Sequence, residues 1–255
     1  MISTYVISLK SSQERRTFIR KHLDSIGVPF RFFDAKDGRK MTDEALRKVA
    51  PKGGIDYCGL LTPAEIGCAI SHLLVIGEIA SGKNDYGVVL EDDVFVLPEA
   101  RKFFDKKFLR SLPAFDILQL DGVDSKRKPR LTLNLGNAGG YQICALPRCH
   151  YGMGGLIYTR EAARLIDNGI TEITAPIDNM IFFDCRVRGL RIIEVRPSIL
   201  RSNTNVPSTI GYRPGPDSFF SKVDREFRRW RNWTRRWRSF VRVWGLSSLL
   251  HLRSA

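Results

Sequence analysis

A chain of 255 residues with 43% apolar and 27% charged side chains can bury a full core and has the composition of an ordinary soluble globular protein. Its formal charge of +14 is unevenly distributed along the chain, because residues 220–255 contain ten Lys and Arg side chains and only two acids. It has no basic-then-apolar leader and no run near the ~20 apolar residues that span a bilayer. We therefore expect neither a signal peptide nor a membrane-spanning helix.

The cysteines are odd in number and include no C-x-x-C pair. This pattern favours reduced thiols in a cytosol over a disulfide framework or a zinc site. Their default role is that of small buried hydrophobic side chains. They are Cys58, Cys68, Cys144, Cys149 and Cys185.

The first 33 residues have the pattern of a βαβ unit. Residues 4–9 predict a strand, Ser11 and Glu14 a capping box that opens a helix, and residues 30–33 a second strand. Right-handed crossover makes such strands parallel. Arg15 lies with Arg16 in the first helical turn, where free N–H groups favour anions. For two arginines alone, however, a solvated helix face is the default interpretation.

An apolar strand at residues 87–90 runs directly into Glu91, Asp92 and Asp93, followed by Val94–Val96. In open α/β sheets the carboxyl ends of strands face the ligand crevice. Three adjacent carboxylates repel one another, and a divalent cation that prefers oxygen ligands relieves the repulsion. The alternative is a plain acidic turn. The strand–acids–strand context favours the metal site.

Other elements follow from caps and periodicity. Thr62, Pro63 and Glu65 open a helix that ends at Gly82, and its His72 is interpreted as a core histidine bonded to a backbone carbonyl. Further along, the pattern predicts strands at residues 115–120, 141–146, 156–159 and 190–195, a long exposed loop at 124–140, and helices at 161–168 and from 177 to Gly189.

All four tryptophans lie between residues 230 and 244, in a segment where aromatic residues recur at helical spacing and arginines fill much of the remainder. Such a helix suits an anionic membrane surface, because indoles sit at headgroup depth and each cation adds about 1 kcal/mol. A core-packing helix and a nucleic-acid-binding arm are the alternatives. The aromatic positions are Phe227, Trp230, Trp233, Trp237, Phe240 and Trp244.

Several motifs in order resemble glycosyltransferase family 25, the lipooligosaccharide glycosyltransferases of Gram-negative bacteria and their collagen-modifying relatives. They are TYVISLKSSQERR, FDAKDG, LTPAEIGCAISHLLV, GVVLEDDV, the Gly-Gly segment with LIYTREAARLI, and PIDNMIF, within residues 3–212. The resemblance implies an α/β fold of GT-A type, Rossmann-like with a mostly parallel central sheet. We expect one catalytic domain at 1–215 and a basic helical tail at 216–255.

The resemblance also implies roles for individual residues. Asp93 would bind the divalent metal, expected to be Mn²⁺, with Asp92 on the ribose and Glu91 in the outer shell. Asp178, in PIDNMIF, would be the general base. The remaining residues would contact the nucleotide sugar: Gly154 and Gly155 the donor sugar, and Arg16, Asp37 and Gly38 the nucleotide. Some metal-dependent relatives add a late histidine ligand, and none occurs here between His150 and His251.

We therefore expect an inverting enzyme that moves a hexose, with galactose favoured, from a UDP-sugar to a lipid-linked oligosaccharide in lipooligosaccharide or lipopolysaccharide synthesis. Its place would be the cytoplasm, peripheral on the inner face of the inner membrane, with no nucleic-acid partner. One alternative is a nucleotidyltransferase acting on sugar phosphates, although the loop KSSQERR lacks the glycines of a phosphate loop. The other is a basic nucleic-acid-binding module.

Overall fold

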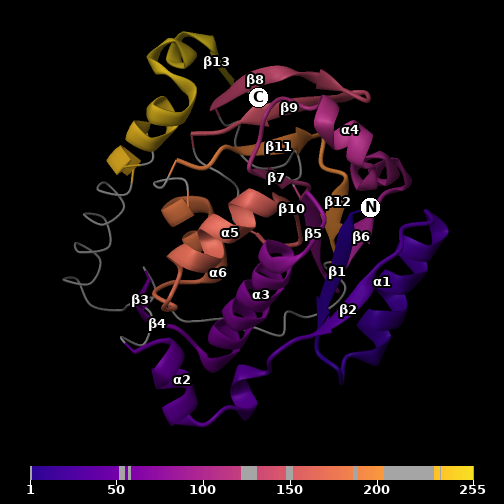
Figure 1. Cartoon of the computed structure of the whole chain (residues 1–255), viewed down its shortest axis with the longest axis vertical. Coiled ribbons are helices and arrows are strands. Elements are labelled where there is room, and N and C mark those ends of the chain that lie inside the picture. Colours follow the sequence, from indigo (N-terminus) through magenta and orange to yellow (C-terminus); the bar gives the residue numbers. More distant parts are fainter. Residues whose placement is uncertain are drawn as a thin grey trace.

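The computed structural model describes residues 2–51, 55–56, 59–121, 131–147, 152–185, 189–203, 233–235 and 237–254. A nine-stranded sheet in the order β13-β8-β9-β11-β7-β10-β5-β1-β2 forms its centre, and β12-β6 and β3-β4 make two small sheets (Figure 1). The strands are β1 (Ser3–Ser8), β2 (Arg31–Asp34), β3 (Ile55–Asp56), β4 (Gly59–Leu60), β5 (Tyr86–Glu91), β6 (Val94–Val96), β7 (Ile117–Gln119), β8 (Leu131–Ala138), β9 (Tyr141–Ala145), β10 (Gly155–Thr159), β11 (Ile192–Arg196), β12 (Leu200–Ser202) and β13 (Leu252–Ser254).

The helical segments are mostly short, and the two longest, α1 and α3, carry the motifs described above. They are α1 (Gln13–Ser25), η1 (Gly38–Lys40), α2 (Asp43–Val49), α3 (Pro63–Ser81), η2 (Pro98–Phe104), α4 (Lys106–Ser111), α5 (Arg160–Gly169), α6 (Ile177–Asn179), η3 (Met180–Cys185) and η4 (Leu246–His251). Residues 233–235 and 237–244 are also helical.

Most strands of the central sheet run in one direction. β2, β1 and β5 are parallel neighbours, which confirms the βαβ unit, and β7 pairs parallel with β11. β10 lies antiparallel between β5 and β7, so these two strands share a direction. With β8, six of the nine strands point one way, and β9, β10 and β13 oppose them. The carboxyl ends of β1, β5 and β7 therefore meet at one edge of the sheet.

The sheet separates two apolar cores, because alternate side chains of each strand face opposite sides. In β1, Tyr5 and Ile7 join the core under α3, α5 and α6, whereas Val6 joins the core that includes α1, η2 and α4. Figure 1 shows α3, α5 and α6 gathered on one face of the sheet.

The helix predicted to begin at Thr62 is confirmed. Thr62 Oγ1 accepts a hydrogen bond from the Glu65 N–H at 3.2 Å, and Glu65 Oε2 accepts one from the Thr62 N–H at 2.7 Å. The resulting helix, α3, is long and apolar enough to cross a membrane by length and composition alone. Nine of its residues are nevertheless buried between the sheet and α5, so it is a core helix.

Two local predictions are wrong, and a third is confirmed in altered form. The capping box at Ser11 and Glu14 does not form, because α1 begins at Gln13 after Ser12, whose side chain makes no capping hydrogen bond. Residues 124–140 are not one long loop, since Leu131–Ala138 form β8. The helix predicted from Ile177 is confirmed over Ile177–Cys185, as three residues of α6 followed by the π-helical η3, and residues 186–188 before its predicted end at Gly189 lie outside the described residues.

The C-terminal segment does not stand apart from the domain. Leu252–Ser254 add β13 to the edge of the sheet beside β8, and Figure 1 shows this segment in yellow folded against that edge. Phe240 is fully buried in the core of α1 and α4, and Trp244 packs against the same core. The boundary expected at residue 215 therefore does not separate the last strand from the sheet. Phe227 and Trp230 lie outside the described residues.

Candidate active site

Four backbone segments meet at the carboxyl edge of the sheet. Ser8 ends β1, Glu91 ends β5, and Asp121 follows β7. Between the last two, the antiparallel β10 begins next to Gly154, whose carbonyl accepts the Glu91 N–H at 3.0 Å and whose N–H donates to Asp121 Oδ2 at 2.9 Å. The edge thus holds carboxylates from two strands on either side of one glycine.

Asp92 is the innermost of the three consecutive acids, with 6% of its surface exposed. Ser8 Oγ donates to its Oδ2 at 2.6 Å, and Arg15 Nη1 donates to its Oδ1 at 2.9 Å. Since burying an unpaired carboxylate is costly, these two partners explain why the acid is tolerated there. The same Arg15 nitrogen lies 3.4 Å from Asp93 Oδ2.

Glu91 turns toward α3. Its Oε1 lies 3.3 Å from Nε2 of His72, whose side chain is 1% exposed. Cys68 lies one helical turn before His72, and the ligand atoms of these three residues all lie within 4.8 Å of one another. The prediction of a buried His72 is confirmed, but its partner is a carboxylate and not a backbone carbonyl.

The acids of this edge repel one another electrostatically. Burial, then the charge of Glu91, raises the pKa of Asp93 to about 6, although Arg15 opposes the shift. Burial and Glu91 likewise raise the pKa of Asp121 to about 7, despite hydrogen bonds from Gly154 and Gln119. Among the described residues, Oδ1 of Asp121 is a buried oxygen without a hydrogen-bond partner.

A close contact between η1 and α3 forms the opposite wall. A Cβ added to Gly38 would lie 1.7 Å from the Pro63 carbonyl oxygen, and one added to Gly67 would lie 2.4 Å from the Gly38 nitrogen. Only glycine fits at either position. Asp37 caps η1 by accepting the Arg39 N–H at 3.2 Å, and the Arg39 guanidinium holds the pKa of Asp37 below its usual value.

These walls enclose a cleft of about 160 Å³, bounded by β1, α1, η1, α3 and the turn after β5. Its polar lining is contributed by side chains with hydroxyl, thiol, imidazole, guanidinium and carboxylate groups. They are Ser8, Ser12, Arg15, Lys36, Asp37, Arg39, Cys68, Ser71, His72, Glu91, Asp92 and Asp93. A site with this lining can hold a polar, charged ligand of small-molecule size.

Five of the nine predicted site residues line this cleft: Asp37, Gly38, Glu91, Asp92 and Asp93. Arg16 instead contacts the ends of β1 and β2, where its Nη2 donates to the Ser8 carbonyl at 2.9 Å and to Asp34. It is not part of a solvated helix face, since its side chain is 15% exposed.

The two glycines expected to line the donor sugar are buried against other side chains. A Cβ on Gly154 would lie 2.9 Å from Asp121 Oδ2, and one on Gly155 would lie 2.0 Å from Leu200 Cδ1. The structure therefore gives them a packing role at the start of β10.

Asp178 is the second residue of α6, which packs against α3. It is not among the residues that line the cleft, but its charge acts on Cys68, which is one of them. Burial, then the charges of Glu91, Asp178 and Asp93, raises the pKa of the Cys68 thiol. The predicted base and the predicted metal ligand thus both act electrostatically on one cysteine.

Sequence reasoning missed several residues. Arg15 neutralises Asp92 although the sequence favours a solvated helix face for it, and the strand predicted at residues 115–120 gives no role to Asp121, which follows it. Asp121 lies at the carboxyl end of a parallel strand, and Arg15 lies in the first helical turn after one. Both positions face the ligand crevice of an α/β sheet, so position alone could have indicated these residues. Gly67 carried no signal, because its role depends on contact with Gly38.

The acidic edge fits a divalent cation with oxygen ligands. The charge of Glu91 raises the pKa of both Asp93 and Asp121, and Oδ1 of Asp121 lacks a hydrogen-bond partner, so positive charge at this position would be stabilised. The described residues supply no late histidine to this edge.

Comparison with known proteins places the chain among glycosyltransferases. The chain is 29% identical over 213 residues to the lacto-N-neotetraose biosynthesis glycosyltransferase LgtE of Neisseria meningitidis serogroup B, covering 78% of this chain and 73% of that protein. It is 26% identical over 186 residues to a glycosyltransferase 25 family member of Aedes aegypti, and there it spans only 30% of the relative's length.

Two solved structures are distantly similar. One is the inositol-1-phosphate CTP transferase from T. maritima, with a TM-score of 0.43, 14% identity, and coverage of 82% of this chain and 92% of that one. The other is a glycosyltransferase involved in glycosylation of the major capsid of PBCV-1, with a TM-score of 0.44, 9% identity, and coverage of 81% and 94%. Likeness at this level carries no functional argument.

The sequence model of glycosyltransferase family 25 (LPS biosynthesis protein) matches residues 1–181, which include the cleft and the acidic turn. The chain therefore belongs to glycosyltransferase family 25 and is an enzyme of the sugar-transferring class.

Proposed function

We propose that this enzyme has a GT-A type catalytic fold and transfers a hexose, with galactose favoured, from a UDP-sugar to a saccharide acceptor in lipooligosaccharide or lipopolysaccharide synthesis. The observation that carries the proposal is the acidic turn of Glu91, Asp92 and Asp93 in a cleft at the carboxyl edge of the sheet, within a chain of this family. Family membership favours this activity over the nucleotidyltransferase and nucleic-acid-binding alternatives.

Asp93 is the proposed protein ligand of a divalent cation, for which Mn²⁺ is the best candidate. Its side chain is 31% exposed against 9% for Asp92, so of the two acids it presents more surface to a cation in the cleft. Such a cation, when bound, would offset the charge of the departing diphosphate.

The chain's own groups supply binding and proton transfer. In the proposed reaction, an acceptor hydroxyl oxygen forms a bond to the sugar C1 while the bond from C1 to the UDP oxygen breaks, which inverts the configuration. Asp178 accepts the hydroxyl proton. Asp92 and the η1 wall of Asp37 and Gly38 would hold the nucleoside, while Arg15 adds positive charge on the diphosphate side.

The C-terminal surface is the proposed contact with an anionic membrane, where a lipid-linked acceptor would reside. Trp233, Leu246 and Leu250 are 56%, 71% and 82% exposed. Exposed arginines, among them Arg238 and Arg242, lie on the same segment. This surface is smaller than the sequence suggested, because Phe240 of the predicted aromatic stripe faces the sheet.

A UDP-release assay across a panel of nucleotide sugars, with and without Mn²⁺, tests the activity. Asp93→Asn should lower turnover at least about 100-fold, and Asp178→Asn by about 100- to 10,000-fold, the range for loss of a general base. Asp85→Asn is the matched control, because Asp85 lies at the other end of β5 and pairs with Lys106 and Arg110 on the surface.

If no nucleotide sugar releases UDP, the proposed function is wrong. Turnover that is unchanged in Asp93→Asn would remove the cation role while leaving sugar transfer intact.

A further inference from the structure

Cys68 and His72 lie beside the acidic turn, have no part in the proposed reaction, and offer a thiol and an imidazole nitrogen as metal ligands. Cys68 and His72 are spaced by four residues on α3, so their side chains lie on one face of the helix. Glu91 completes the group from the end of β5, and all three side chains line the cleft.

The distances suit a tetrahedral metal centre. With Zn–S near 2.3 Å and Zn–N near 2.0 Å, neighbouring ligand atoms lie about 3.3–3.8 Å apart. His72 Nε2 and Glu91 Oε1 are already 3.3 Å apart, and every pair in the group is within 4.8 Å. The two remaining pairs both involve Cys68 Sγ and would need to close by at most about 1 Å to reach this range.

Ligand type separates this cluster from the cation position at Asp93. Thiolate and imidazole ligands select zinc over manganese, whereas carboxylate oxygens suit manganese. Asp178, Asp93 and Glu65 also act electrostatically on Cys68, so the cluster lies in a negative field that attracts any cation. The cluster therefore combines two ligands at fixed spacing on one helix, three different ligand types, and acidic neighbours whose charge attracts a cation.

We propose that Cys68, His72 and Glu91 form a zinc site, with Sγ, Nε2 and a carboxylate oxygen as ligands and a fourth position open to the cleft. The proposal departs from the expectation based on cysteine spacing, which favours reduced thiols over a zinc site. Zinc binding here is independent of the proposed function. Where that function also holds, bound zinc occupies the donor cleft and lowers the rate of sugar transfer.

The first test is spectroscopic and uses the unmodified full-length protein. After metal removal with a chelator, Co²⁺ is added as a probe, and the near-ultraviolet absorption is recorded. A thiolate-to-cobalt charge-transfer band that zinc abolishes at one equivalent is the expected result. A cobalt spectrum without that band, or no cobalt and zinc binding, would overturn the site.

The second test measures zinc affinity by competition with a chromophoric chelator. Cys68→Ala and His72→Gln should each weaken zinc binding by more than about 100-fold. Substituting a residue that only hydrogen-bonds to a metal ligand already lowers metal affinity by about 10- to 100-fold, and the loss of a ligand itself should cost more. Cys144→Ala, in the buried strand β9, and His22→Gln, on α1, are the matched controls and should keep the wild-type affinity.

Circular dichroism of each variant shows whether it is folded. Wild-type zinc affinity in a folded Cys68→Ala protein would contradict the proposal. So would equal losses in Cys68→Ala and Cys144→Ala. If Cys68→Ala does not fold, the cobalt spectrum of the unmodified protein still decides the question.

Discussion

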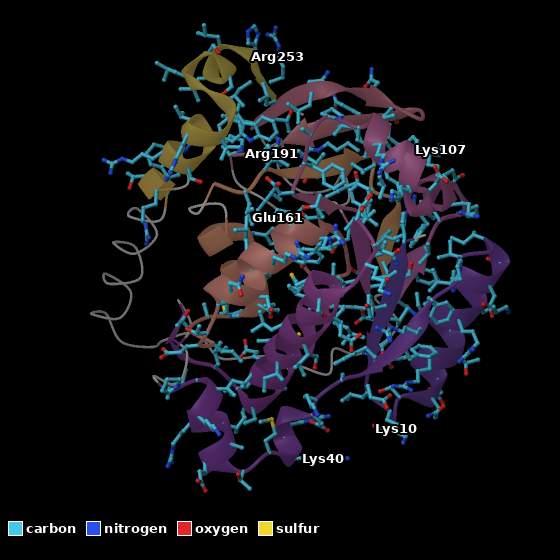
Figure 2. The ribbon with its side chains drawn as sticks, viewed as in Figure 1. Lys10, Lys40, Lys107, Glu161, Arg191 and Arg253 are labelled. Carbon is cyan, nitrogen blue, oxygen red and sulfur yellow. The ribbon has the colours of Figure 1, made fainter. Side chains whose placement is uncertain are left out.

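The two ends of the molecule use charge in opposite ways. At the cleft, carboxylates from β5 and the segment after β7 are buried or half-buried, and Arg15 neutralises only part of their charge. At the C-terminal edge, apolar side chains such as Phe240 are buried, and arginines remain on the surface. In Figure 2, Arg253 of the C-terminal edge lies at one end of the long axis, and Lys10 and Lys40, which follow β1 and end η1, lie at the other.

The contrast indicates that the cleft serves binding and the C-terminal edge serves stability. The cleft retains unfavourable like-charge repulsion, which costs the free protein stability and can be relieved by a bound cation. The C-terminal edge contributes stability through apolar burial. The following changes test that division, from the largest expected effect on the free energy of unfolding to the smallest.

Phe240→Ala should lower the free energy of unfolding by about 3–5 kcal/mol, because the ring is fully buried and its removal leaves a cavity in the core. Denaturant unfolding followed by fluorescence measures the loss. Trp233→Ala, which removes a 56% exposed side chain, is the control and should cost less than about 1 kcal/mol. Equal small effects would mean that the C-terminal segment does not stabilise the domain.

Asp121→Asn should stabilise the metal-free protein, and increasingly so as the pH rises. The pKa of Asp121 is raised to about 7 by burial and by Glu91, so the folded wild-type protein holds this proton more tightly than the unfolded chain does. The stability that this group contributes is present at low pH and is lost as the pH rises through about 7.

The stability gap between Asp121→Asn and wild type should therefore grow by about 2–3 kcal/mol from about pH 5 to about pH 8. Thermal unfolding in chelator at the two pH values measures it. The prediction fails if the gap is the same at both, because a pH-independent gap has no contribution from this proton.

Arg15→Gln should lower the free energy of unfolding by about 2–3 kcal/mol, somewhat less than the loss of a fully buried partner, since Asp92 keeps its hydrogen bond from Ser8 when the Arg15 charge is removed. Added Mn²⁺ should restore more stability to this variant than to wild type, because it replaces the missing positive charge. Thermal unfolding with and without Mn²⁺ measures both effects.

The control is Arg20→Gln on the same helix, where the guanidinium lies 5.1 Å from the Phe32 ring centroid and its loss should cost about 0.5–1 kcal/mol. An Arg15→Gln protein with no larger loss than this control would show that Asp92 does not depend on the ion pair.

Leu246→Ser with Leu250→Ser should change the free energy of unfolding by less than about 0.5 kcal/mol, because both side chains are exposed. Binding to anionic lipid vesicles, measured by co-sedimentation, should nevertheless fall about tenfold or more, since each leucine contributes apolar area at the membrane. Leu165→Ser, which alters a 52% exposed leucine on α5, should bind vesicles like wild type. Vesicle binding that is unchanged in the double variant would remove these leucines from the contact.

The sequence alone determined the features that depend on neighbouring residues. The capping box at Thr62, the apolar run into Glu91, Asp92 and Asp93, and the parallel pairing of β1 with β2 are all set by local spacing and chain handedness. The motif order also determined the family. These signals sufficed to place the acids at the carboxyl edge of a sheet.

Only the tertiary structure decided which distant side chains meet. Arg15 pairs with Asp92 across 77 positions, Asp121 approaches Glu91 from another strand, and His72 reaches Glu91 from α3. The direction of the C-terminal aromatic face was undecided for the same reason, because a helix with one apolar side fits a membrane or a sheet equally well. Periodicity defines such a face, but the surface that covers it is set by contacts far along the chain.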